Sequence, residues 1–172
     1  MGKLNWLIQK SENSPFYLWV LNKVAARTVP FNSSHDLTIQ HITRQSIHVL
    51  LPYKRSNLNH IKGIHACALA TLSEYCTGLV LLSALDPALY RIILKSIHIT
   101  YHYQAKTSVN AKFELSQQWI KENIEDELKN LEAIFTELKI EVYDVNNNHI
   151  CTGLIHWQIK SWKNVKTKVQ QL

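Results

Sequence analysis

The stretch IHACALATLSEYCTGLVLLSAL, residues 64–85, is apolar on nearly every side when it is drawn as a helix. A helix of 22 residues spans about 33 Å, enough to cross the core of a bilayer. Glu74 lies near the centre of the stretch, however, and a carboxylate at that depth is costly in lipid. We therefore expect a helix buried inside the protein itself and no membrane partner.

Segments that alternate apolar and polar residues flank this helix. They predict strands over 38–51, 91–104, 108–115, 137–145 and 150–162. A helix without a polar face must be enclosed, and a curved antiparallel sheet wrapped around it achieves this. The strands do not alternate regularly with helices, so the predicted fold class is α+β.

Period-two spacing also predicts which side chains of the strand over 91–104 face the helix. Ile93, Ile97, Ile99, Tyr101 and Tyr103 are expected to share that face.

The remaining segments define the domain organisation. A further helix is predicted over residues 15–27. We assign residues 1–36 to an N-terminal helical extension, 37–165 to the domain that holds the sheet and the apolar helix, and 166–172 to a basic tail.

Composition excludes several classes of protein. The chain has 172 residues, a hydrophobic fraction of 46% and a charged fraction of 19%, so it is one globular domain and not a disordered chain. Four glycines leave no dinucleotide-binding fingerprint. Three cysteines without a secretory signal indicate reduced thiols and a cytoplasmic location. The net charge of +6 permits an anionic partner without naming one.

A polar loop leads into the apolar helix and carries the candidate chemistry. The loop runs from Asn59 through Gly63 and His65 to Ala66 at the expected start of the helix. The first N–H groups of a helix lack intrahelical partners and can stabilise an oxyanion. Glu74, a carboxylate inside an apolar helix, is a candidate base or nucleophile.

Helix geometry separates these groups. His65 and Glu74 are nine residues apart, so they are turned about 180° from each other and lie about 13 Å apart along the axis. Two copies of the helix about a twofold axis would bring Glu74 of one copy near the helix start of the other. We therefore expect a homo-oligomer with a site shared between subunits.

The run from Asn59 through His65-Ala66-Cys67 to Leu72-Ser73-Glu74 resembles the active-site segment of hotdog-fold acyl-CoA thioesterases. The most similar branch is the phenylacetate-pathway type, in which His-Gly-Gly follows the Asn by six residues and Leu-Ala-Asp comes next. The resemblance extends over about residues 38–162. Ala66-Cys67 replaces Gly-Gly and Glu74 replaces Asp, departures typical of an uncharacterised thioesterase-like subgroup.

This resemblance implies a hotdog fold, an acyl-CoA or related thioester as substrate, and a homodimer or dimer of dimers. It implies that Glu74 activates water or attacks the thioester, that the Ala66 N–H polarises the carbonyl, that Asn59 orients water or substrate, and that His65 assists. No cofactor is implied beyond the coenzyme A of the substrate.

Four neighbouring residues complete the expected substrate-binding set. These residues are Gly63, Cys67, Lys54 and Arg55. Lys54 and Arg55, which lie just before the loop, are candidates for contacts to the phosphates of coenzyme A.

Simpler interpretations of the same residues remain open. Glu74 could be a structural carboxylate paired with a Lys or Arg, Asn59 could brace the loop, and His65 is more typical of a structural residue at a helix start. The domain could also bind acyl-CoA without turnover. A hydratase would use Asp36 and His41, whose spacing is suggestive but which precede a strand.

Other motifs are weak. His98 with His102, and His149 with Cys151, share strand faces but have no third or fourth ligand at a recognisable spacing, so no metal site is expected. Residues 157–168 interleave aromatic and basic side chains, which a solvated tail explains as well as a nucleic-acid surface does. We expect no nucleic-acid partner.

Overall fold

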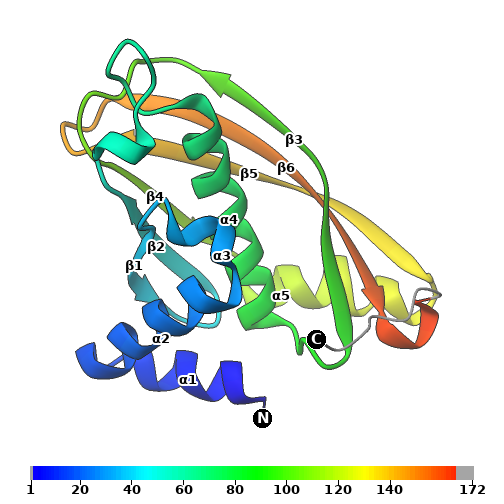
Figure 1. The fold of residues 1–172 in the computed structure, drawn as a ribbon. Coiled ribbons are helices and arrows are strands. Elements are labelled where there is room, and N and C mark those ends of the chain that lie inside the picture. Colours follow the sequence, from blue (N-terminus) through cyan, green and yellow to red (C-terminus); the bar gives the residue numbers. More distant parts are fainter. Residues whose placement is uncertain (1, 166–172) are drawn as a thin grey trace.

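A computed structural model describes residues 2–165 of the chain. Three helices come first, and Figure 1 shows them on the same side of the sheet as the long central helix. They are α1 (Lys3–Ser11), α2 (Pro15–Thr28) and α3 (Pro30–Ser33). The Ser14 hydroxyl caps α2 by accepting a hydrogen bond from the Tyr17 N–H (3.5 Å), and Pro15 occupies the first turn, where its missing N–H costs nothing.

The sheet has six antiparallel strands in the order β1-β2-β4-β5-β6-β3. The strands are β1 (Thr38–Ile42), β2 (Ser46–Leu51), β3 (Tyr90–Tyr101), β4 (Val109–Glu114), β5 (Ala133–Asp144) and β6 (His149–Ser161). Short helical segments connect them: η1 (Arg55–Asn57), α5 (Gln117–Ile120), η2 (Lys121–Glu125), η3 (Glu127–Lys129) and η4 (Trp162–Asn164).

The central helix α4 (Ala66–Ala84) lies against the concave side of this sheet (Figure 1). Its side chains pack against strands from β2 to β6, and Leu72, Cys76, Val80 and Leu81 are fully buried. Within residues 2–165, α4 is the one helix long and apolar enough to cross a membrane by length and composition, and most of it is buried in the protein. The predicted α+β hotdog fold, a curved sheet around one apolar helix, is confirmed.

The segment 38–51 is not one strand, as its alternation predicted, but the hairpin of β1 and β2. Its turn is built by a side chain, because the Thr43 hydroxyl accepts hydrogen bonds from the N–H groups of Gln45 (3.1 Å) and Ser46 (3.0 Å). A threonine hydroxyl that takes over backbone donors in this way makes a turn without glycine or asparagine.

The predicted face of β3 is wrong at its N-terminal end. The register with β6 shifts between Leu94 and Ser96, which marks a β-bulge at Lys95. Ile93 pairs with Gln158 on the outer face of the sheet, whereas Ile97 pairs with the buried Ile155. The residues Ile92 and Leu94 before the bulge, and Ile97, Ile99 and Tyr101 after it, therefore face α4.

Strand β3 forms one edge of the sheet and pairs only with β6 among residues 2–165. The edge carries apolar side chains that are exposed in the single chain, namely Ile93, Leu94, Ile97 and Tyr101. The predicted basic tail, residues 166–172, lies outside the described residues.

Candidate active site

The loop before α4 is held together by Asn59. Its side-chain oxygen accepts hydrogen bonds from the N–H groups of Ile61 (3.1 Å) and Gly63 (3.0 Å), so this residue braces the loop. Gly63 lies so close to Gln104 that a Cβ at this position would meet the Gln104 side chain at 2.9 Å. A side chain at position 63 would therefore force the exposed Gln104 side chain to move.

The N-terminus of α4 is capped by His65. The Nδ1 atom of its ring accepts a hydrogen bond from the Cys67 N–H (3.0 Å), and the side chain is exposed. The Ala66 N–H, in contrast, has no hydrogen-bond acceptor within residues 2–165. Among the described residues, the first turn thus keeps one free donor, the Ala66 N–H.

A cavity of about 340 Å³ opens beside this turn. Asn59, Ala66 and Tyr101 are among the residues that line it. The Tyr101 hydroxyl donates a hydrogen bond to the Ala66 carbonyl (3.1 Å), which joins the C-terminal end of β3 to the start of α4. Cys67, next to Ala66, is a free and exposed thiol.

Glu74 lines a different cavity, of about 350 Å³. Its walls are mostly apolar and come from α4, from β3 and β6, and from the segment after α2. Burial raises the pKa of the Glu74 carboxyl above its ordinary value, because the charged form loses solvation. No ion pair to Glu74 occurs within the described part of the chain, so the structural pairing with Lys or Arg is not found there.

Trp157 of β6 also lines the Glu74 cavity. Its indole N–H donates to the Thr77 hydroxyl (3.1 Å), and its ring packs over Gly78 so closely that a Cβ on Gly78 would meet the ring at 2.9 Å. The same Cβ would lie 3.8 Å from a Glu74 carboxylate oxygen. Gly78 therefore lets the Trp157 ring pack closely against the helix.

The structure thus gathers Asn59, Gly63, His65, Ala66 and Cys67 at the start of α4 and leaves Glu74 in a separate cavity. A single chain contains the two halves of the predicted site, but it does not bring them together.

Neither of the two basic residues before the loop lines either cavity. Lys54 forms an ion pair with Asp36, and Arg55 is exposed at the start of η1. Asp36 and His41 line different cavities, so a site that uses both is not formed in one chain.

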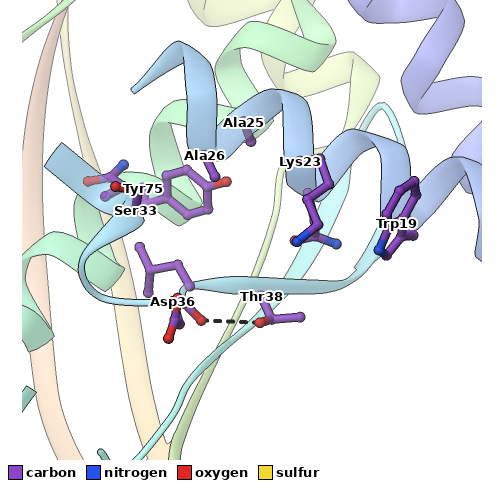
Figure 2. A pocket seen from close by; sticks show the side chains of 11 residues that line it. Trp19, Lys23, Ala25, Ala26, Ser33, Asp36, Thr38 and Tyr75 are labelled. Atoms are coloured by element: carbon purple, nitrogen blue, oxygen red, sulfur yellow. Dashed lines mark hydrogen bonds between the residues drawn. The ribbon is translucent and has the colours of Figure 1, made fainter. Parts of the chain in front are cut away.

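A further cavity, of about 320 Å³, lies beside α2. Figure 2 shows Trp19 and Lys23 at one end of it and the Tyr75 ring pointing towards α2 at the other. Asn32 and Tyr75 line this cavity and the Glu74 cavity as well. Neither residue has a local pattern that marks it as functional, since Asn32 lies in a polar Asn-Ser-Ser turn and Tyr75 has ordinary core spacing.

No group of three His, Cys, Asp or Glu side chains in residues 2–165 is placed to hold a metal ion. His102 and His149 do lie together, with ring centroids 4.4 Å apart, and the Thr152 hydroxyl lies within hydrogen-bond distance of both rings.

Comparison with solved structures identifies the fold. A protein of unknown function from Pseudomonas aeruginosa, described as a probable thioesterase, superposes with a TM-score of 0.77 at 20% identity, over 83% of this chain and 95% of that one. A thioesterase from Haemophilus influenzae gives a TM-score of 0.65 at 13% identity, over 88% and 95% of the two chains. A mutant thioesterase from P. aeruginosa gives a TM-score of 0.66 at 9% identity, over 88% of this chain and 99% of that one.

At such identities the shared property is the hotdog fold. No curated protein shows significant sequence similarity to the chain. A family model described as a domain of unknown function, DUF4442, matches residues 18–159, a region that begins within α2. The chain therefore belongs to the DUF4442 family.

Proposed function

We propose that the protein is a cytoplasmic thioesterase that hydrolyses an acyl-CoA or related thioester at sites shared by two subunits. The observation that carries the proposal is the place of the two half-sites on the edge strand β3. Ile92, near the N-terminal end of β3, lines the Glu74 cavity. Tyr101, at the C-terminal end, contacts Ala66 at the start of α4.

Pairing of two copies along β3 would unite these halves. Antiparallel pairing about a twofold axis places the N-terminal end of one β3 beside the C-terminal end of the other. The Glu74 cavity of one subunit would then face the Ala66 turn of its partner. The exposed edge and its apolar side chains favour such pairing, because an unpaired strand edge is a template for another chain. A dimer, or a dimer of such dimers, follows.

The chemistry needs one base and one oxyanion donor. The Glu74 carboxylate takes a proton from water, and the water oxygen adds to the thioester carbonyl carbon. The free Ala66 N–H, at the positive end of α4, stabilises the resulting oxyanion. Collapse breaks the C–S bond, and the proton on Glu74 passes to the departing thiolate, which leaves a carboxylic acid and a free thiol. A raised pKa makes Glu74 a stronger base.

The supporting residues then take structural roles. Asn59 shapes the loop through its carboxamide oxygen, and His65 caps α4. Gly63 and Cys67 line the approach to the free N–H, and the exposed Arg55 is available for a phosphate of coenzyme A. Thioesterases among the structural neighbours support a thioester substrate.

The first test measures thiol release from short, medium, long and aromatic acyl-CoAs. Glu74→Ala should abolish release while the fold and the oligomer persist. Ala66→Pro should also abolish it, because proline removes the N–H yet is tolerated at the first position of a helix, and the preceding residue His65 is already extended (ψ 139°). Full activity of folded Glu74→Ala would refute the mechanism.

A mixing experiment tests the shared site. When equal amounts of Glu74→Ala and Ala66→Pro exchange subunits, about half of the dimers contain one subunit of each variant. Each mixed dimer has one intact site and one doubly altered site, so about a quarter of wild-type activity should return. No recovery from two folded, exchanging variants would show that the site is not shared. If acyl-CoAs bind in calorimetry but no thiol is released from the unaltered protein, it is a non-catalytic acyl-CoA-binding domain.

A further inference from the structure

Two buried polar side chains lie beside Glu74 without partners. Asn32 is 7% exposed and Tyr75 is 8% exposed, and within residues 2–165 neither the Asn32 carboxamide nor the Tyr75 hydroxyl makes a hydrogen bond. The fully buried side-chain atoms without a partner in residues 2–165 are Asn5 Oδ1 and Arg91 Nε, so the Asn32 carboxamide and the Tyr75 hydroxyl are still reached through the cavities that they line. Both groups are therefore free to bind a ligand that enters these cavities.

The backbone around Asn32 is held in place. Its N–H donates to the Val29 carbonyl (3.0 Å), and its carbonyl accepts from the His35 N–H (3.1 Å). His35 in turn lies 3.0 Å from the Asn57 side-chain oxygen through its Nδ1 atom. The Asn32 carboxamide is therefore presented by an ordered segment, although it has no partner of its own.

Both side chains form a boundary between two cavities of different chemistry. On one side lies the Glu74 cavity, with apolar walls that include Phe31, Leu79 and Trp157. On the other side lies the cavity beside α2, where Lys23, Ser33 and Thr38 supply polar groups. Asn32 and Tyr75 line both cavities, so a ligand that passes from one to the other must pass these two residues.

We propose that Asn32 and Tyr75 bind the amide-bearing pantetheine arm of a coenzyme A thioester, whose acyl group occupies the apolar Glu74 cavity and whose arm continues into the polar cavity beside α2. The amides of that arm offer both donors and acceptors. The Asn32 carboxamide can donate to the amide carbonyls and accept from the amide N–H groups, and the Tyr75 hydroxyl adds a second donor. The proposal rests on the proposed thioesterase function and specifies how its substrate lies.

Two substrates with the same acyl group separate this role from a general one. Octanoyl-CoA carries the arm, and S-ethyl thiooctanoate does not. Asn32→Leu and Tyr75→Phe should each lower kcat/KM for octanoyl-CoA by about three- to tenfold, the worth of one hydrogen bond, chiefly through KM. Neither variant should change kcat/KM for the S-ethyl ester. Ser34→Ala, at an exposed position next to this segment that lines neither cavity, is the matched control and should change neither.

The thermal midpoints of the variants provide a second readout. A structural role would make both substitutions destabilising. If the two polar groups face only the cavities until a ligand binds, replacing them by apolar side chains should leave Tm unchanged, because no hydrogen bond within the protein is lost. Lowered Tm in both variants, or equal losses with both substrates, would overturn the proposal.

Calorimetry with pantetheine itself keeps the proposal independent of turnover. The unaltered protein should bind pantetheine, and Asn32→Leu and Tyr75→Phe should each weaken its Kd by the same three- to tenfold factor. Absence of pantetheine binding would refute the proposal even in an active thioesterase. Binding that both variants weaken would support it even if no acyl-CoA were hydrolysed, a result that would refute only the proposed reaction.

Discussion

Replacing Gly78 by alanine sets two effects against each other in the middle of α4. Alanine is the better helix former, and the exchange favours the folded helix by about 0.5–1 kcal/mol. The new methyl group, however, would lie 2.9 Å from Cη2 and 3.1 Å from Cζ2 of Trp157. Overpacking of that kind costs about 1–3 kcal/mol when the neighbour cannot move away.

The Trp157 ring has little freedom to move. It is 4% exposed, and its N–H is bonded to the Thr77 hydroxyl at 3.1 Å. The clash should therefore exceed the helix gain, and we expect Gly78→Ala to lower the free energy of unfolding by about 1 kcal/mol, or Tm by about 2–4 °C for a chain of this length.

A double-mutant cycle in chemical denaturation tests this reasoning. Trp157→Phe removes the outer ring atoms that meet the new methyl group. In that background Gly78→Ala should become neutral or stabilising, so the sign of its effect depends on the partner residue. Stabilisation by Gly78→Ala in the wild-type background, or the same loss in both backgrounds, would refute the proposed contact.

Two further predictions concern α4. Glu74→Gln should raise the free energy of unfolding at neutral pH, because burial raises the pKa of the Glu74 carboxyl above 4.5 and its ionisation at higher pH opposes folding. This gain should vanish below about pH 4.5, where the carboxyl is protonated in both the folded and the unfolded state. Urea titrations in which the gain persists at low pH would contradict the argument. His65→Ala should cost about 0.5–2 kcal/mol through the lost cap, whereas His65→Asn, a good N-cap, should keep both stability and thiol release; loss of turnover in stable His65→Asn would restore a chemical role to the imidazole.

The central helix could be predicted from sequence because its apolar character is continuous, and Glu74 near its centre favours the protein interior over a membrane. The hairpin of β1 and β2 could not, because its turn contains no glycine or asparagine and depends on the hydroxyl of Thr43. The residues Thr43, Arg44 and Gln45 read as a blurred continuation of the strand. A side chain that replaces backbone partners leaves little trace in a hydropathy pattern.

The candidate site was predicted only where its residues adjoin in sequence. The loop from Asn59 to Ala66 and the carboxylate of Glu74 both follow from local spacing on one helix. Asn32 and Trp157 reach the Glu74 cavity from opposite ends of the chain. Their role is set by tertiary packing, and neither residue has a local pattern that distinguishes it from a turn residue or a core residue.

The bulge at Lys95 gives β3 one residue more than the stretch of β6 with which it pairs. The extra residue resets the phase of the strand, so the side chains on both sides of it face α4, and Lys95 itself lies over the Phe135 ring at 4.1 Å from the centroid. Deletion of that single residue would remove the bulge and leave regular pairing, because Trp157 and His156, the partners of Leu94 and Ser96, are already consecutive in β6. Ile97 and Tyr101 would still face α4. One unpaired position therefore accounts for the whole change of phase that the sequence of β3 shows.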